Sequence, residues 1–189
     1  MKDIRLLSLR QEDRPAYEAL YESSFPVSER KNLDFMLTGD NSAAYEVLAV
    51  STPDCPVAGM VITVTHGGLT MLDYLAISPD LRGQGLGHAV LPMVRDRVKE
   101  SGGGRFFLEI ETPPPLCIPR DPCDNAEQRV RRKAFYESAG MVETGVRAFI
   151  YGNDMELLAF PEDAEAITFA GYDALLRATF PKGMEAERI

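Results

Sequence analysis

The chain has few of the residues that build metal centres and disulfide frameworks. Its 189 residues include three cysteines and two histidines. An odd number of cysteines without short paired spacings argues against a disulfide framework or a zinc site. Two histidines, His66 and His88, are too few for a histidine-rich metal site. We therefore expect no bound metal, and we expect the cysteines to be structural or incidental.

Long apolar segments and an excess of positive charge are also missing. No apolar run is long enough to span a bilayer, and residues 1–13 carry too many charges for a secretory signal. The formal net charge of -9 disfavours generic binding to nucleic acid or to an anionic membrane. We expect a soluble cytoplasmic protein that binds neither. The acidity is also compatible with a cationic or amine-bearing substrate.

Periodicity, proline and glycine predict an ordered series of elements in a single domain, residues 1–189, without repeat or linker. Strands are expected at residues 3–10, 44–51, 57–65, 69–78, 105–112, 142–152 and 155–160. Helices are expected at residues 10–25, 28–39, 86–101, 125–140 and 161–180. Gly67 and Gly68 fit a hairpin turn, and dense proline makes residues 113–124 a loop. The order βααβββαβαββα predicts an α/β or α+β layered fold.

Three glycines, Gly83, Gly85 and Gly87, lie in one short turn between an expected strand and an expected helix. The first N–H groups of a helix have no internal partner, and the helix dipole is positive there. Glycine lets a phosphate approach those groups, and Arg82 can add charge-assisted bonds. The turn therefore predicts a nucleotide-derived cofactor that bears phosphate.

The spacing of these glycines excludes two common phosphate motifs. A P-loop needs lysine and then serine or threonine after its last glycine, where this chain has His88 and Ala89. A dinucleotide fingerprint needs G-x-G-x-x-G, whereas the glycines here run G-x-G-x-G after three expected antiparallel strands.

Two segments resemble the GNAT superfamily of N-acetyltransferases. LAISPDLRGQGLGHAVL is similar to its acetyl-CoA-binding motif, Q/R-x-x-G-x-G/A, and AFYESAGM is similar to its LYEKLGF segment. The motif is matched position by position at Arg82, Gly83, Gln84, Gly85, Leu86 and Gly87. The resemblance covers most of residues 3–160. It implies an α/β (α+β) fold with a mixed, mostly antiparallel central sheet flanked by helices, a splayed strand pair, and an extra C-terminal helix within residues 161–189.

The resemblance also implies how acetyl-CoA is held. The glycine turn cradles the pyrophosphate, in a gap between the strands that end near Ile77 and Thr112. The pantetheine contacts the backbone of Leu75, Ala76 and Ile77, whose side chains pack in the core on any reading. Many family members carry asparagine and alanine where this chain has Arg129 and Arg132. That departure suggests two cations near the CoA phosphates in place of the usual pantetheine contact.

Tyr136 stands at the family's usual catalytic tyrosine and could protonate the departing thiolate. Its spacing alone also fits a tyrosine at the rim of the core, next to Phe135. The attacking amine must lose a proton, and a carboxylate can take it. Glu109 and Glu111 share one face of an expected strand and are ranked above Asp73. The alternative is that these acids form salt bridges with Arg105, Arg129 or Arg147.

The region between the first two helices forms one wall of the acceptor site in the family. Glu29 and Arg30 could bind charged groups of the substrate there, together with Asp73. The alternative is a capped helix start with solvated charges.

Taken together, the sequence predicts direct acetyl transfer from acetyl-CoA to a primary amine of a small molecule or peptide, by a monomer or homodimer. Two alternatives are a catalytically silent acyl-CoA-binding module and an acyltransferase that uses a bulkier acyl group.

Overall fold

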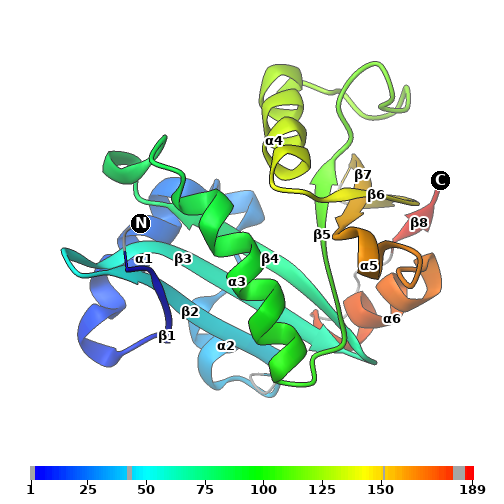
Figure 1. The fold of residues 1–189 in the computed structure, drawn as a ribbon. Coiled ribbons are helices and arrows are strands. Elements are labelled where there is room, and N and C mark those ends of the chain that lie inside the picture. Colours follow the sequence, from blue (N-terminus) through cyan, green and yellow to red (C-terminus); the bar gives the residue numbers. More distant parts are fainter. Residues whose placement is uncertain (1–2, 42–43, 151, 181–185) are drawn as a thin grey trace. The chain divides into compact units, whose positions relative to one another are not determined.

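Strands and helices follow one another along the chain as shown in Figure 1, a computed structural model that describes residues 3–41, 44–150, 152–180 and 186–189. The strands are β1 (Arg5–Ser8), β2 (Tyr45–Thr52), β3 (Cys55–His66), β4 (Leu69–Ile77), β5 (Arg105–Glu111), β6 (Val142–Ile150), β7 (Asn153–Ala159) and β8 (Glu187–Arg188). The α-helices are α1 (Arg14–Ser24), α2 (Leu33–Thr38), α3 (Leu86–Glu100), α4 (Ala126–Ser138), α5 (Pro161–Ala164) and α6 (Phe169–Thr179). Short 3-10 turns are η1 (Gln11–Asp13), η2 (Val27–Glu29) and η4 (Pro79–Leu81).

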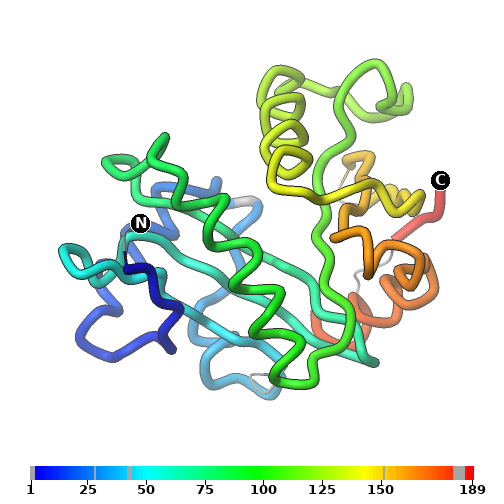
Figure 2. Tube along the Cα trace, in the orientation of Figure 1, coloured from blue at the N-terminus to red at the C-terminus, as the bar shows by residue number. Residues whose placement is uncertain are grey.

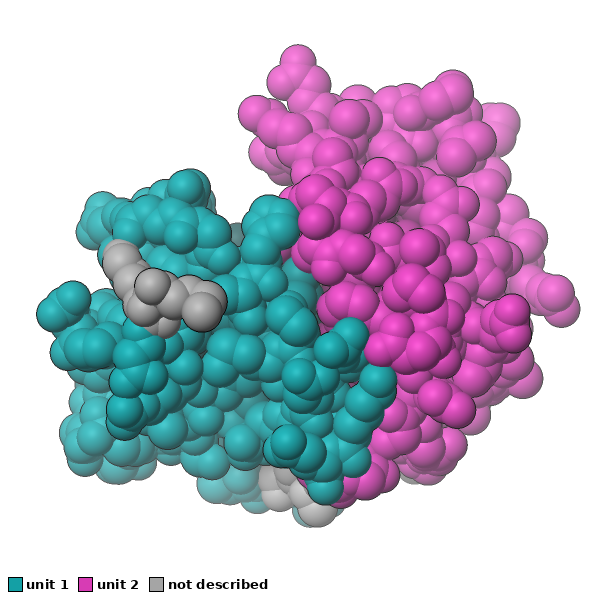
Figure 3. All heavy atoms as spheres, viewed as in Figure 1, with its two compact units in different colours: residues 1–64, 72–100 teal, residues 65–71, 101–189 magenta. Residues whose placement is uncertain are grey.

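The eight strands form one sheet in the order β1-β2-β3-β4-β5-β7-β6-β8. The pairs β1/β2, β2/β3, β5/β7, β6/β7 and β6/β8 are antiparallel. This mostly antiparallel sheet with flanking helices confirms the predicted α/β (α+β) class. The chain divides into two compact units (Figure 3): unit 1 contains residues 1–64 and 72–100, and unit 2 contains residues 65–71 and 101–189. That the whole chain acts as a single domain stays a prediction.

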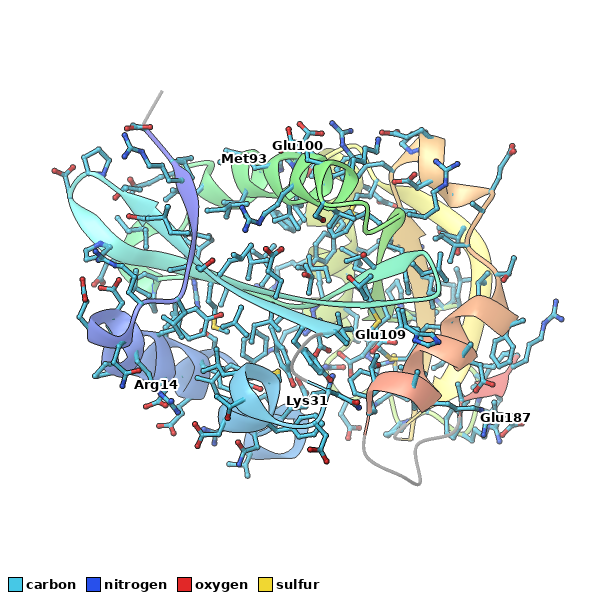
Figure 4. All side chains as sticks on the ribbon, turned by 90° about the horizontal axis from the view of Figure 1, so that it is seen from below. Arg14, Lys31, Met93, Glu100, Glu109 and Glu187 are labelled. Carbon is cyan, nitrogen blue, oxygen red and sulfur yellow. The ribbon has the colours of Figure 1, made fainter. Side chains whose placement is uncertain are left out.

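Unit 1 places helices on both faces of its strands. Figure 4 shows α3 over one face of β2, β3 and β4, and α1 with α2 over the other. Residues 57–64 of β3 are buried on both sides for this reason. Helix α3 turns one apolar stripe toward the strands, because its buried residues recur three and four positions apart. The stripe consists of Leu86, Val90, Leu91, Val94 and Val98.

Unit 2 is built around β5, whose residues 106–108 are fully buried. Helices α4 and α5 pack on β5, and α6 packs on β6. The β3–β4 hairpin turns at Gly67 and Gly68, with φ of +59° and +78°, as the sequence predicted. Gly104 has φ of +80°, and a Cβ there would lie 1.9 Å from the Gly68 carbonyl oxygen. Only glycine therefore lets the start of β5 approach this hairpin.

Two expected helices differ from the structure in their bounds. The helix expected over 161–180 is broken into α5 and α6, because Thr168 caps α6 by accepting a hydrogen bond from the Gly171 N–H at 3.2 Å. The helix expected over 28–39 begins only at Leu33, after Asn32 caps it in the same way. Tyr151, inside the strand expected over 142–152, lies outside the described residues.

Candidate active site

The glycine turn of residues 82–87 leads from η4 into helix α3 of unit 1, and its path can be followed in Figure 2. Gly83 and Gly85 have φ of +72° and +78°, and a Cβ at either position would meet no atom within 4 Å. The turn is exposed, whereas Leu86, the first residue of α3, is buried. The turn therefore offers an open helix N-terminus whose free N–H groups fit a pyrophosphate.

Arg82 connects this turn to the end of β4. Its Nε donates a hydrogen bond to the Ile77 carbonyl oxygen at 3.0 Å. Its two terminal nitrogens have no partner within the described ranges, so they remain available to an anion. Ile77 ends the three-residue segment predicted to bind pantetheine, in which Leu75 and Ile77 are half-buried and Ala76 is buried. Gln84 lies at the tip of the turn, where its side chain donates to the Asp80 carbonyl at 3.3 Å.

The segment expected to face the acceptor is fixed by two tyrosine hydroxyls in unit 1. Tyr74 donates to the Glu29 carbonyl at 2.7 Å, and the Lys31 N–H donates to the Tyr21 hydroxyl at 2.9 Å. Phe25 completes the aromatic cluster, with its ring centroid 4.9 Å from that of Tyr74. The backbone of residues 29–31 is therefore ordered by aromatic side chains. The Glu29 side chain is exposed at its surface.

Asp73 has a partner that the sequence did not reveal. Lys31, labelled in Figure 4, places its Nζ 2.6 Å from both carboxylate oxygens of Asp73, whose side chain is 7% exposed. Burial raises the pKa of Asp73, and the Lys31 ammonium offsets part of that rise. Arg30 lies beside Glu22, with 3.9 Å between charged atoms. An acceptor ammonium that binds Asp73 must therefore compete with Lys31.

Glu111, at the end of β5 in unit 2, accepts hydrogen bonds from three side chains. Arg132 Nη1 donates to its Oε2 at 2.9 Å, Asn125 Nδ2 donates to the same oxygen at 2.8 Å, and Arg129 Nη2 donates to its Oε1 at 3.2 Å. The Glu111 side chain is 14% exposed. This is the arginine pairing that the sequence left as the alternative to a catalytic role, and it holds the carboxylate in one orientation.

Arg129 is buried, with a side chain only 1% exposed. Its Nη1 and Nη2 donate to Asp121 at 2.7 and 3.0 Å, and its Nε donates to Asn125 at 2.6 Å. Further bonds reach the Thr112 carbonyl and Asn153. Burial alone would lower the pKa of Arg129, but the Asp121 hydrogen bonds and the Glu111 charge raise it.

That Arg129 contacts the CoA phosphates stays a prediction, and its environment disfavours it, because each of its guanidinium nitrogens already has an acceptor within the protein. Arg129 instead joins α4 to the loop and the strands around it. Arg132, 40% exposed and paired with Glu111, keeps nitrogens that can reach an anion. The sequence did not reveal Asp121, the main partner of Arg129, because a proline-rich loop has no apolar periodicity from which its buried residues could be predicted.

Tyr136 lies on α4, one helical turn after Arg132. Burial raises the pKa of its hydroxyl to about 12, and the Arg132 charge lowers it slightly. Its ring contacts Phe135 at a centroid distance of 5.0 Å, as a rim tyrosine would, and its hydroxyl has no hydrogen-bond partner within the described part of the chain. The hydroxyl is therefore protonated at neutral pH and available to donate.

Glu109, labelled in Figure 4, has a different environment from Glu111 although both lie on β5. Its Oε2 accepts a hydrogen bond from the hydroxyl of Tyr172, a fully buried residue of α6. The C-terminal helix thus positions one of the two carboxylates predicted to act as the base.

The loop between β5 and α4 brings two cysteines together. Cys117 Sγ and Cys123 Sγ lie 2.9 Å apart, and this contact raises the pKa of Cys123 to about 11. Among the described residues, no group of three or more His, Cys, Asp or Glu side chains could hold a metal ion. Over the same ranges, no helix is both long and apolar enough to cross a membrane.

The comparison with known families gives one match, over residues 6–114, to the model described as the Acetyltransferase (GNAT) family. Residues 6–114 are more than half of the chain and include the glycine turn. A search of the curated proteins finds no match.

Solved structures of low sequence identity share the fold. A protein of Bacteroides thetaiotaomicron described as a GNAT-family acetyltransferase has a TM-score of 0.70 and 19% identity, covering 92% of this chain and 96% of its own. The ribosomal-protein-S18-alanine N-acetyltransferase of Escherichia coli has a TM-score of 0.54 and 23% identity, covering 88% and 99%. The spermidine/spermine N-acetyltransferase SpeG of Vibrio cholerae has a TM-score of 0.57 and 17% identity, covering 82% and 90%.

Proposed function

The chain belongs to the acetyltransferase (GNAT) family, and from that premise we propose that it transfers the acetyl group of acetyl-CoA directly to a primary amine of a small molecule or peptide. The observation that carries this proposal is the open glycine turn at the start of α3, where Gly83 and Gly85 leave the helix N-terminus accessible. The enzyme class follows from the family. The acceptor and the residue roles are the proposal.

The cofactor is held by residues of unit 1. The N–H groups of residues 83–87 bind the pyrophosphate, and the terminal nitrogens of Arg82 neutralise its charge. The backbone of Leu75, Ala76 and Ile77 binds the pantetheine. When bound, acetyl-CoA supplies the thioester whose acyl carbon is open to attack by an amine.

The proton transfers are assigned to two carboxylates of β5 and a tyrosine of α4. Glu109 or Glu111 takes a proton from the acceptor ammonium, so that the free amine can form the new N–C bond as the C–S bond breaks. Tyr136 donates its hydroxyl proton to the leaving sulfur, for which its pKa of about 12 is suited because the group stays protonated at neutral pH. Neither Cys117 nor Cys123 has a histidine near it in the sequence to act as its base, which supports direct transfer without an acyl-enzyme.

The acceptor is proposed to be cationic before it loses its proton. Glu29, Arg30 and Asp73 are assigned to its binding, and Lys31 occupies the Asp73 carboxylate at 2.6 Å. The solved relatives include enzymes named for spermidine or spermine and for a ribosomal-protein alanine, both of which carry amines. These names support the amine class.

The test combines binding and turnover. Calorimetry should show micromolar binding of acetyl-CoA, and Gly85→Asp should weaken it at least tenfold, because the new carboxylate lies beside the phosphates. Gly67→Asp is the matched control: Gly67 also has positive φ and open space around it, but it lies in the β3–β4 hairpin. CoA release across a panel of amines then identifies the acceptor.

Equal affinities in the two folded aspartate variants would contradict the cradle assignment. Tight binding of acetyl-CoA with no CoA release for any amine would instead favour a binding module over an enzyme. Faster CoA release from a longer acyl-CoA would favour the bulkier acyl donor.

A further inference from the structure

Two thiols meet in the loop of residues 112–125 that connects β5 to α4. Cys117 Sγ lies 2.9 Å from Cys123 Sγ, less than about 1 Å beyond the length of a disulfide bond. Both side chains are partly exposed, so a small reagent can reach them. The third cysteine, Cys55, begins β3 in unit 1. Two of the three cysteines therefore form a close pair in this loop, and the third lies in a different part of the chain.

The loop backbone is folded to bring the two sulfurs together. The Asp121 N–H donates to the Ile118 carbonyl at 3.0 Å, which turns the chain back between the cysteines. The Ile118 N–H donates to Asp154 Oδ2 at 3.0 Å, and the Cys123 N–H donates to Asp121 Oδ1 at 2.8 Å. Cys123 itself has φ of +53°, a conformation uncommon for a side chain other than glycine. The approach of the thiols thus depends on the loop backbone as well as on their side-chain rotamers.

We propose that Cys117 and Cys123 form a dithiol site that closes reversibly to a disulfide by exchange with a low-molecular-weight disulfide such as oxidised glutathione. One cysteine thiolate attacks a glutathione sulfur, the glutathione S–S bond breaks, and one glutathione thiol leaves. The second cysteine then attacks the mixed disulfide, forms the Cys117–Cys123 bond and releases the second glutathione thiol. Two cysteine thiols are oxidised, one glutathione disulfide is reduced, and two protons pass to glutathione.

A Cys117–Cys123 disulfide would enclose Asp121, the residue that binds Arg129. Asp121 lies between the two cysteines and binds Arg129 through both carboxylate oxygens. Arg129 in turn contacts Glu111 at 3.2 Å. Formation of the disulfide therefore restrains Asp121, on which the buried hydrogen bonds of Arg129 depend. A nearby resolving thiol is also the arrangement that favours a reversible disulfide over lasting glutathione adducts.

Trypsin cleavage distinguishes the linkage, because each cysteine falls in a different tryptic peptide. Cys117 lies in residues 106–120, Cys123 in residues 121–129 and Cys55 in residues 32–82. The folded full-length protein is incubated with oxidised glutathione, the remaining thiols are alkylated, and the chain is then denatured, digested and analysed by mass spectrometry. We expect peptides 106–120 and 121–129 to appear linked, to lose about 2 Da relative to the summed free peptides, and to separate on reduction.

The free thiol count should fall from three to one in the folded protein treated at low reagent excess. Cys55→Ser should leave the linked pair unchanged, whereas Cys123→Ser should replace it with a glutathione adduct on Cys117. In strong urea the yield of the linked pair should fall and that of separate glutathione adducts should rise, because only the short chain segment then brings the two thiols together. Separate adducts on Cys117 and Cys123 in the folded wild type, or a linkage to peptide 32–82, would overturn the proposal. None of these readouts depends on acetyl transfer, so they stand apart from the proposed enzymatic function.

Discussion

Replacing Asp121 with asparagine should lower the free energy of unfolding by about 3 kcal/mol. Removing one partner of a buried ion pair costs about 3–5 kcal/mol, because the other charge is left without compensation. Arg129 keeps Glu111 at 3.2 Å and the Thr112 carbonyl at 3.1 Å, so the lower end of that range applies. For a chain of this length the melting temperature should fall by roughly 6–12 °C.

The pH dependence of stability gives a second readout of the same substitution. Burial alone would raise the pKa of Asp121, but hydrogen bonds from Arg129 and from two backbone N–H groups hold it below its ordinary value. A carboxyl whose folded pKa is depressed stabilises the fold fully above its unfolded pKa, about 3.9, and loses that contribution as the pH falls through the folded value. The difference between wild type and Asp121→Asn should therefore be largest near neutral pH and shrink below about pH 4.

Urea unfolding at pH 7 and at pH 3 measures both effects. Asp96→Asn is the matched control, since Asp96 is 57% exposed and pairs with Arg95 at 2.9 Å on the surface of α3. Such an exposed pair contributes about 0.2–1 kcal/mol. If Asp121→Asn destabilises the protein no more than Asp96→Asn does, the Arg129 network is not the support that its burial indicates.

Three further substitutions test other parts of the structure. Tyr136→Phe should leave acetyl-CoA binding intact and slow turnover by roughly 10²-fold, and an unchanged rate would return Tyr136 to the rim of the core. Gly104→Ala should destabilise the protein far more than Gly102→Ala in chemical unfolding. Both glycines have positive φ, but only at Gly104 would a Cβ lie 1.9 Å from a backbone oxygen. Gly102→Ala should therefore lower the free energy of unfolding by only about 1–2 kcal/mol. Glu111→Gln should lower the rate more at neutral pH than at high pH, where free amine is abundant; an equal loss at all pH values with a lower melting temperature would make Glu111 structural.

Local patterns predicted most of the elements. The alternating and apolar runs of β2 to β5 and the amphipathic stripe of α3 are properties of short segments, and tertiary structure moved their bounds by one or two residues. The glycine turn was likewise predictable, because its chemistry depends on four glycine and arginine positions within one segment. The break near Thr168 was not predicted: a threonine within an apolar pattern reads as helix until its side chain is seen to cap the following turn.

The side-chain networks could not be read from the sequence, because their members are far apart along the chain. Lys31 and Asp73 are 42 residues apart, and Tyr172 and Glu109 are 63 apart. Arg129 was expected near the CoA phosphates or in a salt bridge, and only the folded loop that carries Asp121 shows it to be buried. The two cysteines are close in sequence, but their contact depends on a turn that proline density alone does not specify.

The partners of β5 are synthesised long after β5 itself. Strand β7 pairs with it, Asp163 accepts from the Phe106 N–H, and Tyr172 reaches Glu109 from a point 63 residues further along the chain. At a translation rate of about 5–20 residues per second, Tyr172 is synthesised roughly 3–12 s after Glu109 of β5. Until β7 has been made, one edge of β5 is unpaired, and Phe107 lacks its contact with Tyr172 until the end of that interval. A nascent chain at this stage is a substrate for chaperones that recognise extended apolar segments, and slower translation of residues 112–172 should lengthen their association with it.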